Sequence, residues 1–326
     1  MNKNLTMNQP KKRSFFEFFV TKRGRQTMLI VSGATAVSLF MGNFLPHTFG
    51  LGYYKDFVQS YQNGIPREVP ENVKQRLEKA MDILQLRRYE RLIIRPFTVV
   101  GFDLFQAGSI KYRFGSEFGI PVNYSYASPN DIKRSEIRFR DKEINWNSES
   151  GKLLEESIVL TEQEQIFSFC KSILQLQTHK ILMNSIFPSI TFIGMYAVGN
   201  YVNLRNNFYA RPLALRLVLY SILGLFGLGS WSFLKDFNQV TYDADIDKKL
   251  CELGPDFVEV GTTYYEKLLK RNMALRALLN NDQYTAKGNE NYLIRQKTIP
   301  LTLRKSFFEG KLKELQSGTQ TENEVA

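Results

Sequence analysis

The sequence predicts an α+β membrane protein in which three transmembrane helices carry an extramembrane domain of a small sheet plus helices. Three long apolar runs predict the membrane helices, since a helix needs about 20 mostly apolar residues to cross a bilayer. The stretches between and after these runs show the periodicities of amphipathic helices and short strands. With 43% hydrophobic and 23% charged residues, the composition is typical of a folded chain.

The three predicted transmembrane helices lie at 27–46, 181–203 and 213–234. The alternative is that they are core helices of a soluble protein, but three such lengths in one chain are rare in soluble folds. The first run could instead be a secretory signal peptide. No clean small-residue cleavage site follows it, so we expect a retained anchor.

Charge is distributed unevenly around these helices. The net charge of the chain is +11, and the basic N-terminal tail (1–26) holds seven Lys and Arg against Glu17 alone. The loop between the second and third helices holds Arg205 and Arg211 and no acid. Three spans place this loop and the tail on the same side, in agreement with the positive-inside rule. The tail could act as a mitochondrial address, and no nucleic-acid-binding module surrounds it.

The segments 47–180 and 235–313 then share the opposite side, where they can pack into one extramembrane domain. Residues 70–86 predict an amphipathic helix, and short apolar runs from 95 to 159 predict several strands. A capping box at 161–164 predicts a helix that continues into the second span. Further helices are expected at 242–253 and 258–280. The polar residues 314–326 predict a disordered tail.

Few residues offer chemistry. The two histidines, His47 and His179, have no partners at metal-ligand spacing, and Cys170 and Cys251 are expected to be ordinary thiols. No phosphate-binding glycine motif is found in a suitable context, so we predict no metal and no cofactor. Small residues in the spans are candidates for helix packing. These candidates are Ser32, Ala36, Gly199, Gly224, Gly227 and Gly229.

Four stretches carry a resemblance to a known family. They are RPFTVVGFDLFQAGSIKYRFGSEFGIPV (95–122), INWNSESGKLLEESIVLTEQEQ (144–165), VEVGTTYYEKLLKRNMALRALL (258–279) and IRQKTIPLTLRKSFFEG (294–310). Together with the placement of the spans, they resemble the transmembrane protein 177 family of vertebrates. The resemblance implies a multi-pass protein of the mitochondrial inner membrane that takes part in cytochrome c oxidase biogenesis. Its implied partners are the bilayer, newly made subunit 2 of the oxidase and the assembly chaperone of that subunit.

A fainter resemblance concerns membrane-embedded zinc peptidases of the CAAX prenyl protease type. The order of strands, capped helix, two spans and later helices is similar to theirs. Their HExxH motif falls on residues 171–175, and their ExxAD motif falls on 241–245. The ligand and base positions, as this resemblance aligns them, are Lys171, Ser172, Gln175 and Thr241, whereas Ala244 and Asp245 match.

These departures predict a peptidase-like scaffold without catalysis. Lys171 has three donors and no acceptor at neutral pH, so it cannot ligate zinc as imidazole does. The function implied is a non-catalytic assembly factor. The alternative is a membrane-embedded metallopeptidase-like enzyme, which would hold stoichiometric zinc.

Overall fold

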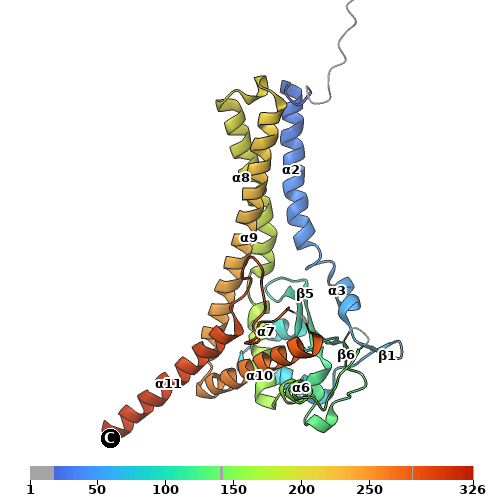
Figure 1. The fold of residues 1–326 in the computed structure, drawn as a ribbon, viewed down its shortest axis with the longest axis vertical. Helices are drawn as coiled ribbons and strands as arrows, with labels where there is room; N and C mark the ends of the chain where they lie inside the picture. The colour runs from blue at the N-terminus through green and yellow to red at the C-terminus, as the bar shows by residue number, and fades with distance from the viewer. Residues whose placement is uncertain (1–17, 140–141, 281, 326) are drawn as a thin grey trace, which may run out of the picture. The chain divides into compact units, whose positions relative to one another are not determined.

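The computed structural model describes residues 18–139, 142–280 and 282–325, which form two compact units (Figure 1). Unit 1 consists of the chain up to residue 43 and residues 184–234. Unit 2 consists of residues 44–183 and 235–326. Most of the predicted basic tail, residues 1–17, lies outside the described residues. The stretch before the second span and the stretch after the third span both belong to unit 2.

Three long helices correspond to the predicted spans, the first of which ends at Phe44, two residues before its predicted end at 46. They are α2 (Lys22–Phe44), α8 (Lys180–Arg205) and α9 (Leu213–Cys251), and all three are long and apolar enough to cross a membrane. Only 11%, 11% and 6% of their most apolar windows are buried within the protein, so most of this apolar surface is available to lipid. The chain is therefore a multi-pass membrane protein.

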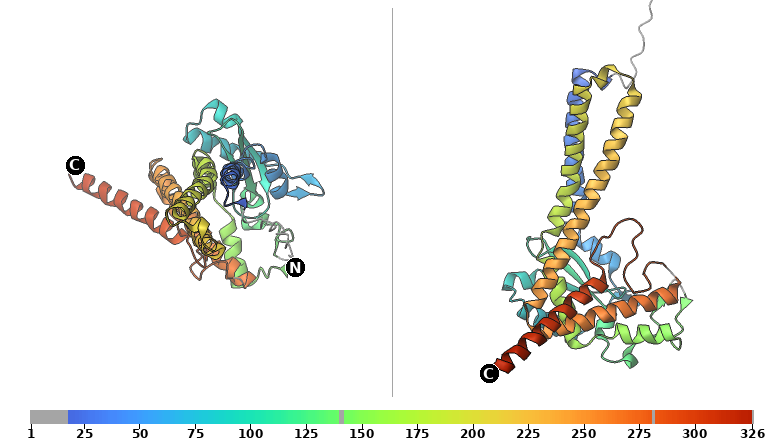
Figure 2. Two further views of the ribbon diagram at one scale, coloured as in Figure 1. Left: turned by 90° about the horizontal axis from the view of Figure 1, so that it is seen from above. Right: turned by 60° about the vertical axis from the view of Figure 1, so that its left-hand side comes forward.

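Specific contacts join the helices of unit 1, which run alongside one another in Figures 1 and 2. The hydroxyl of Ser189 on α8 donates to the carbonyl oxygen of Ala36 on α2 at 2.7 Å. Asn203 on α8 donates through its side-chain amide to the Tyr220 hydroxyl on α9 at 2.7 Å. A short 3₁₀ turn, η3 (Phe208–Ala210), connects α8 to α9. Interhelical hydrogen bonds of this kind fix the register of apolar helices that lipid alone would not order.

Unit 2 contains the predicted small sheet. Strands β3 (Ile94–Val99), β5 (Gly115–Pro121) and β4 (Phe105–Ser109) lie in the order β3-β5-β4. The β3–β5 pair is parallel, with Phe97 opposite Gly119, and the β4–β5 pair is antiparallel, with Phe105 opposite Gly119. Two short hairpins accompany this sheet. They are β1 (Tyr61–Gln62) with β2 (Ile65–Pro66), and β6 (Arg138–Phe139) with β7 (Lys142–Glu143).

Helices cover both faces of the three-stranded sheet. Helix α3 (Leu51–Val58) covers one face, where Tyr54 lies 6.4 Å from the Phe105 ring. A larger residue than Gly119 would not fit on this face, because a Cβ there would lie 2.8 Å from the Cβ of Phe105. On the opposite face Phe118 contacts Phe169 of α7 (Glu162–Leu176), with ring centroids 5.9 Å apart. The sheet is thus a central layer between α3 and α7.

Helix α4 (Glu71–Ile83) confirms the amphipathic helix predicted at 70–86. Its apolar stripe packs on α7, and its polar face is solvated. The buried members of the stripe are Val73, Leu77, Ala80 and Met81.

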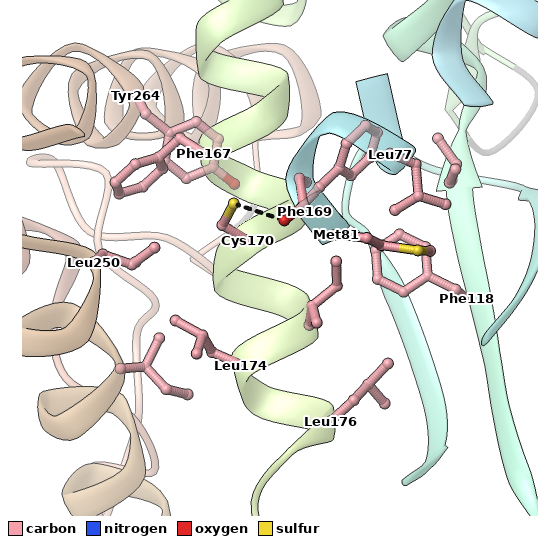
Figure 3. Close-up of a cluster of buried hydrophobic side chains, with 14 of the residues drawn as sticks. Leu77, Met81, Phe118, Phe167, Phe169, Cys170, Leu174, Leu176, Leu250 and Tyr264 are labelled. Carbon is pink, nitrogen blue, oxygen red and sulfur yellow. Dashed lines mark hydrogen bonds between the residues drawn. The ribbon is translucent and has the colours of Figure 1, made fainter. Parts of the chain in front are cut away.

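Helix α7 lies in the middle of the core, with other elements on both sides (Figure 3). Phe167 and Phe169 are fully buried, and so is Cys170, whose thiol donates to the Ala80 carbonyl oxygen of α4 at 3.8 Å. The predicted capping box is confirmed: Thr161 Oγ1 accepts from the Glu164 amide at 3.3 Å, and Glu164 Oε2 accepts from the Thr161 amide at 2.7 Å. Helix α7 is buried on several faces and also carries buried polar residues, such as Gln165 and Ser168, which are hydrogen-bonded.

The expectation that this helix runs unbroken into the second span is wrong. Helix α7 ends at Leu176, and α8 begins at Lys180. The Leu176 carbonyl oxygen bonds to the end of β4 instead of to the next helical turn. It accepts from Ser109 Oγ at 2.8 Å and from the Ile110 amide at 3.2 Å. The Thr178 hydroxyl donates to the Gln175 carbonyl at 2.7 Å. These bonds replace the helical ones, so the chain turns without a proline or glycine.

The remaining helices complete unit 2. They are α5 (Arg88–Leu92), α6 (Glu149–Ile158), α10 (Pro255–Leu279) and α11 (Leu301–Val325), with the 3₁₀ turns η1 (Val122–Ser125) and η2 (Pro129–Asp131). Helix α10 packs on α6, α7 and α11. Helix α11 continues through residues 314–325, for which the composition predicts disorder. The segment contains no proline to stop a helix already started by the packed residues before it.

The contact between α10 and α11 gives a stability prediction. A Cβ on Gly261 would lie 2.4 Å from the ring of Phe308, which is fully buried. We expect Gly261→Ala to lower the free energy of unfolding by about 1–3 kcal/mol through overpacking. Gly310→Ala is the matched control, because no atom lies within 4 Å of a Cβ there. Denaturant titration of both variants in micelles checks this, and equal stabilities would contradict the packing described.

Candidate functional site

The positions that the peptidase resemblance selects lie on two helices of unit 2. Lys171, Ser172 and Gln175 are on α7, and Thr241 and Asp245 are on α9. Ser172 is buried, whereas Thr241 and Asp245 are exposed. Only the α7 positions therefore face the interior. The acidic residues of α9 that do so are Asp243 and Asp247, one turn apart on its inner face.

These two acids belong to a buried polar group that we call the Lys171 cluster. Its members are Lys171 of α7, Asp243 and Asp247 of α9, Tyr265 of α10 and Arg304 of α11. Asp243, Asp247, Tyr265 and Arg304 are all buried. The cluster therefore links four helices through polar contacts inside an otherwise apolar core.

Arg304 forms the strongest contacts in the cluster. Its Nε lies 2.7 Å from Asp247 Oδ2 and its Nη2 lies 2.6 Å from Asp247 Oδ1, a bidentate pair. Its Nη1 lies 3.7 Å from Asp243 Oδ1. Burial would lower the pKa of Arg304, but Tyr265 and Asp247 outweigh burial and raise it, so the guanidinium stays charged.

Tyr265 connects the acids to Lys171. Its hydroxyl donates to Asp247 Oδ1 at 2.9 Å, and the Arg304 guanidinium lies 5.0 Å from its ring centre. Burial raises the pKa of Tyr265 well above its ordinary value, so the phenol remains protonated. The Lys171 ammonium lies 5.3 Å from the centre of the same ring and 5.8 Å from that of Tyr264. Both distances are within the range of a cation–π interaction.

Lys171 is held largely by aromatic faces. Burial, followed by repulsion from Arg304, lowers the pKa of Lys171 to about 8, and attraction by Asp247 and Asp243 opposes the change. The amine is therefore still mostly charged at neutral pH. With Arg304, Asp243 and Asp247 also charged, the two positive and two negative charges balance.

The arrangement favours holding helices together over chemistry. In the described part of the chain, no three His, Cys, Asp or Glu side chains lie close enough to hold a metal ion. The Asp247 carboxylate, which could act as a base, accepts bonds from Arg304 and Tyr265. Both oxygens of this carboxylate are thus already occupied by donors within the cluster.

Sequence reasoning missed Asp243, Asp247, Tyr265 and Arg304 as a group. A signal was present on α9, where Asp243 and Asp247 share a helical stripe with the apolar Ile246 and Leu250. Acids on an apolar stripe require buried partners. No comparable signal identifies Arg304, which lies more than 50 residues later on another helix.

The candidate packing residues of the spans fall into two groups. Ser32 and Ala36 are buried, and a Cβ on Gly199 or Gly227 would lie 3.2 Å from Leu223 or 3.0 Å from Met195. These four residues pack helices within unit 1. Gly224 and Gly229 differ, because no atom lies within 4 Å of a Cβ placed on either. Their faces of α9 are open.

A polar groove of about 610 Å³ lies between the start of α7 and helix α10. Two of its acids are paired with lysines. Lys267 Nζ lies 2.6 Å from Glu164 Oε2, and Lys270 Nζ lies 2.8 Å from Glu266 Oε1. Hydrogen bonds from Lys270 and Lys305 lower the pKa of Glu266. These pairings favour fixed charges over a proton-transfer site.

The remaining candidate residues make local contacts. The His47 ring stacks on Tyr54 with centroids 5.3 Å apart, and His179 Nδ1 lies 3.2 Å from the Tyr112 hydroxyl. Cys170 and Cys251 are both free thiols. Burial raises the pKa of Cys170 to about 12, so this thiol is a poor nucleophile.

The buried ion pair gives a second stability prediction. Arg304→Ala leaves Asp247 charged and buried, so we expect a loss of about 3–5 kcal/mol in the free energy of unfolding. Arg304→Lys keeps the charge but not the bidentate geometry, and we expect an intermediate loss. Lys74→Ala, which removes an exposed pair with Glu71, is the control and should have little effect. Denaturant titration of the purified full chain measures all three. An Arg304→Ala variant as stable as the control would contradict a stabilising role.

Lys171 gives a prediction for pH. Because its pKa is lower in the folded chain than in the unfolded chain, the unfolded state binds more protons between about pH 8 and pH 10.5. The Lys171 contribution is thus unfavourable at neutral pH, and stability is regained as pH rises through this window. We expect Lys171→Met to be more stable than the unchanged chain at pH 7, and the difference to shrink toward pH 10. Unfolding midpoints of both chains from pH 7 to 10 measure this. A difference that is constant with pH would contradict it.

Comparisons with known proteins find relatives that are named as transmembrane proteins. The family model described as "Transmembrane protein 177" matches residues 19–304. The chain is similar to transmembrane protein 177 of Xenopus laevis, with 23% identity over 92% of this chain and 96% of the relative. It is also similar to the Danio rerio protein of that name, with 26% identity over 84% and 89% of the two chains. The Homo sapiens protein of that name is 25% identical over 65% of this chain and 69% of the relative. No solved structure matches. Since the family model covers most of its length, the chain belongs to the transmembrane protein 177 family.

Proposed function

We propose that this protein is a non-catalytic assembly factor of the mitochondrial inner membrane, which stabilises newly made cytochrome c oxidase subunit 2 together with its assembly chaperone. The proposal starts from what the resemblance to the family implies. The observation that carries it is the open surface of α9 at Gly224 and at Gly229, where an added Cβ would meet no other side chain or element within 4 Å. A glycine on a lipid-facing helix lets the backbone of another membrane helix approach closely.

The physical basis of stabilisation is mass action. A partner that binds only the folded or partly assembled subunit lowers the population of free subunit that proteases can degrade. Occupancy alone supplies this effect, with no chemical step. The exposed apolar windows of the three spans offer the surface such binding requires, since only 6–11% of each is buried.

The Lys171 cluster supports the non-catalytic part of the proposal. The peptidase resemblance places a zinc ligand at Lys171, whose ammonium instead rests on Tyr264 and Tyr265. It places the other ligands at Gln175 and Thr241 and the general base at Ser172. None of the four residues supplies an imidazole or a carboxylate. We infer a peptidase-like scaffold that keeps the helix arrangement and uses the former site for packing.

We also propose that residues 47–180 and 235–313 face one compartment, the intermembrane space. The basic tail and the loop with Arg205 and Arg211 would then face the matrix, as the positive-inside rule favours. Protease treatment of mitochondria with a ruptured outer membrane should cleave both segments. Cleavage of one segment and protection of the other would overturn this topology.

Glycine substitutions test the docking face. We expect Gly224→Leu and Gly229→Leu to reduce recovery of subunit 2 with the protein and to shorten the pulse–chase lifetime of the subunit toward that of a deletion strain. The side chains would fill space that the partner helix requires. Gly33→Leu on α2 is the matched control, because its Cβ position is also open. Unchanged subunit 2 turnover in the deletion strain would overturn the function itself. Loss with all three variants would overturn only the assignment to α9.

A further inference from the structure

An aromatic stripe that begins in the turn before α3 and continues along the helix is mostly exposed. Phe49, Tyr53 and Phe57 are 73%, 83% and 89% exposed, although the Phe49 ring also contacts the Phe114 ring, with centroids 4.9 Å apart. Tyr53 and Phe57, four residues apart on α3, lie on the same side of the helix, and Phe49 precedes them by four residues in the turn that leads into it. Leu51, on another side of the helix, is buried, and Tyr54 contacts Phe105 of the sheet. Helix α3 is therefore anchored by one face while its aromatic stripe points outward.

A second apolar surface lies in the loop between α10 and α11. Leu293 and Ile294 are 99% and 96% exposed. Arg295 and Lys297 follow them directly. Contiguous exposed apolar side chains of this kind usually mark a surface that contacts something other than water.

Both surfaces are attached close to the ends of spans. A compact turn links the last residue of α2, Phe44, to the start of the stripe: the Phe49 and Gly50 amides both donate to the Leu45 carbonyl, at 2.9 and 3.0 Å. The loop is tied to α9 by Arg295, whose Nε lies 3.3 Å from Asp236 Oδ2. Asp236 follows the predicted third span, 213–234, by two residues. Each surface is thus linked, along the chain or through an ion pair, to a residue next to the end of a predicted span.

We propose that the aromatic stripe of α3 and the Leu293–Ile294 loop insert into the interfacial layer of the bilayer, on the side of the membrane that holds unit 2. Aromatic side chains prefer this layer, where apolar rings meet headgroups. Short amphipathic helices lie in it with the apolar face inward. Arg295 and Lys297 match the lipid phosphates beside the inserted loop. The partner is thus a lipid surface, and the two contacts hold unit 2 against it.

Spin labels in the full chain test this proposal. Cysteine variants Phe57→Cys and Ile294→Cys are made in a Cys251→Ser background, and Cys170 stays because it is fully buried. The chain is reconstituted into phosphatidylcholine vesicles. Power saturation then compares collisions with oxygen, which concentrates in the bilayer, and with a water-soluble nickel chelate. Glu149→Cys is the control, because Glu149 is exposed at the start of α6 and belongs to neither of the two surfaces.

We expect the oxygen-to-nickel ratio to be several-fold higher at 57 and 294 than at 149. Equal ratios at all three positions would place both surfaces in water and overturn the proposal. Low collision rates with both reagents would show that protein covers the surface, a second copy or another partner, and would also overturn it. If Phe57→Cys does not fold, Tyr53→Cys on the same stripe replaces it.

Discussion

Unit 2 depends on the burial of helix α7. Fully buried side chains of this helix contact α4 and the sheet on one side and α9 and α10 on the other (Figure 3). Before α7 in sequence come the strands and α4. After it, beyond the two spans, come the last part of α9, α10 and α11. Neither set could bury its own apolar surface alone, so α7 requires both halves of the chain to meet on one side of the membrane. An odd number of spans between the two halves would separate them, whereas α8 and α9 make two.

The Lys171 cluster fixes how these halves meet. Apolar packing alone tolerates small shifts of one helix along another. The bidentate contact between Arg304 and Asp247 does not, because two parallel hydrogen bonds define both distance and direction. Such buried ion pairs contribute little net stability but strongly disfavour arrangements that leave one partner unpaired. The cluster thus sets the register of α11 against α9.

Most of the fold could be predicted from the sequence because local signals agree with the final structure. Apolar length identified the spans, periodicity identified α4 and α10, and the Thr161–Glu164 capping box marked the start of α7. The end of α7 could not be predicted, since it depends on Ser109 of β4 capturing the Leu176 carbonyl. The pairing of Arg304 with Asp247 is equally non-local. The positions taken from the peptidase resemblance include Asp245, which is exposed and lies two residues from each of the buried acids Asp243 and Asp247.

The two units use apolar surface in opposite ways, and this bears on how the protein could act on a partner. Unit 2 buries its apolar core internally, and the α3 stripe and the Leu293–Ile294 loop are among the apolar side chains that it leaves exposed. In unit 1, only 6–11% of the most apolar stretch of each span is buried within the protein. Lipid satisfies that surface without a preferred partner, because lipid chains are as apolar as the side chains. A selective contact in the membrane must therefore come from shape, and the open glycines of α9 supply a shape that lipid fills poorly and a neighbouring helix fills well. Selectivity within the bilayer and rigidity outside it would then reside in different units of one chain.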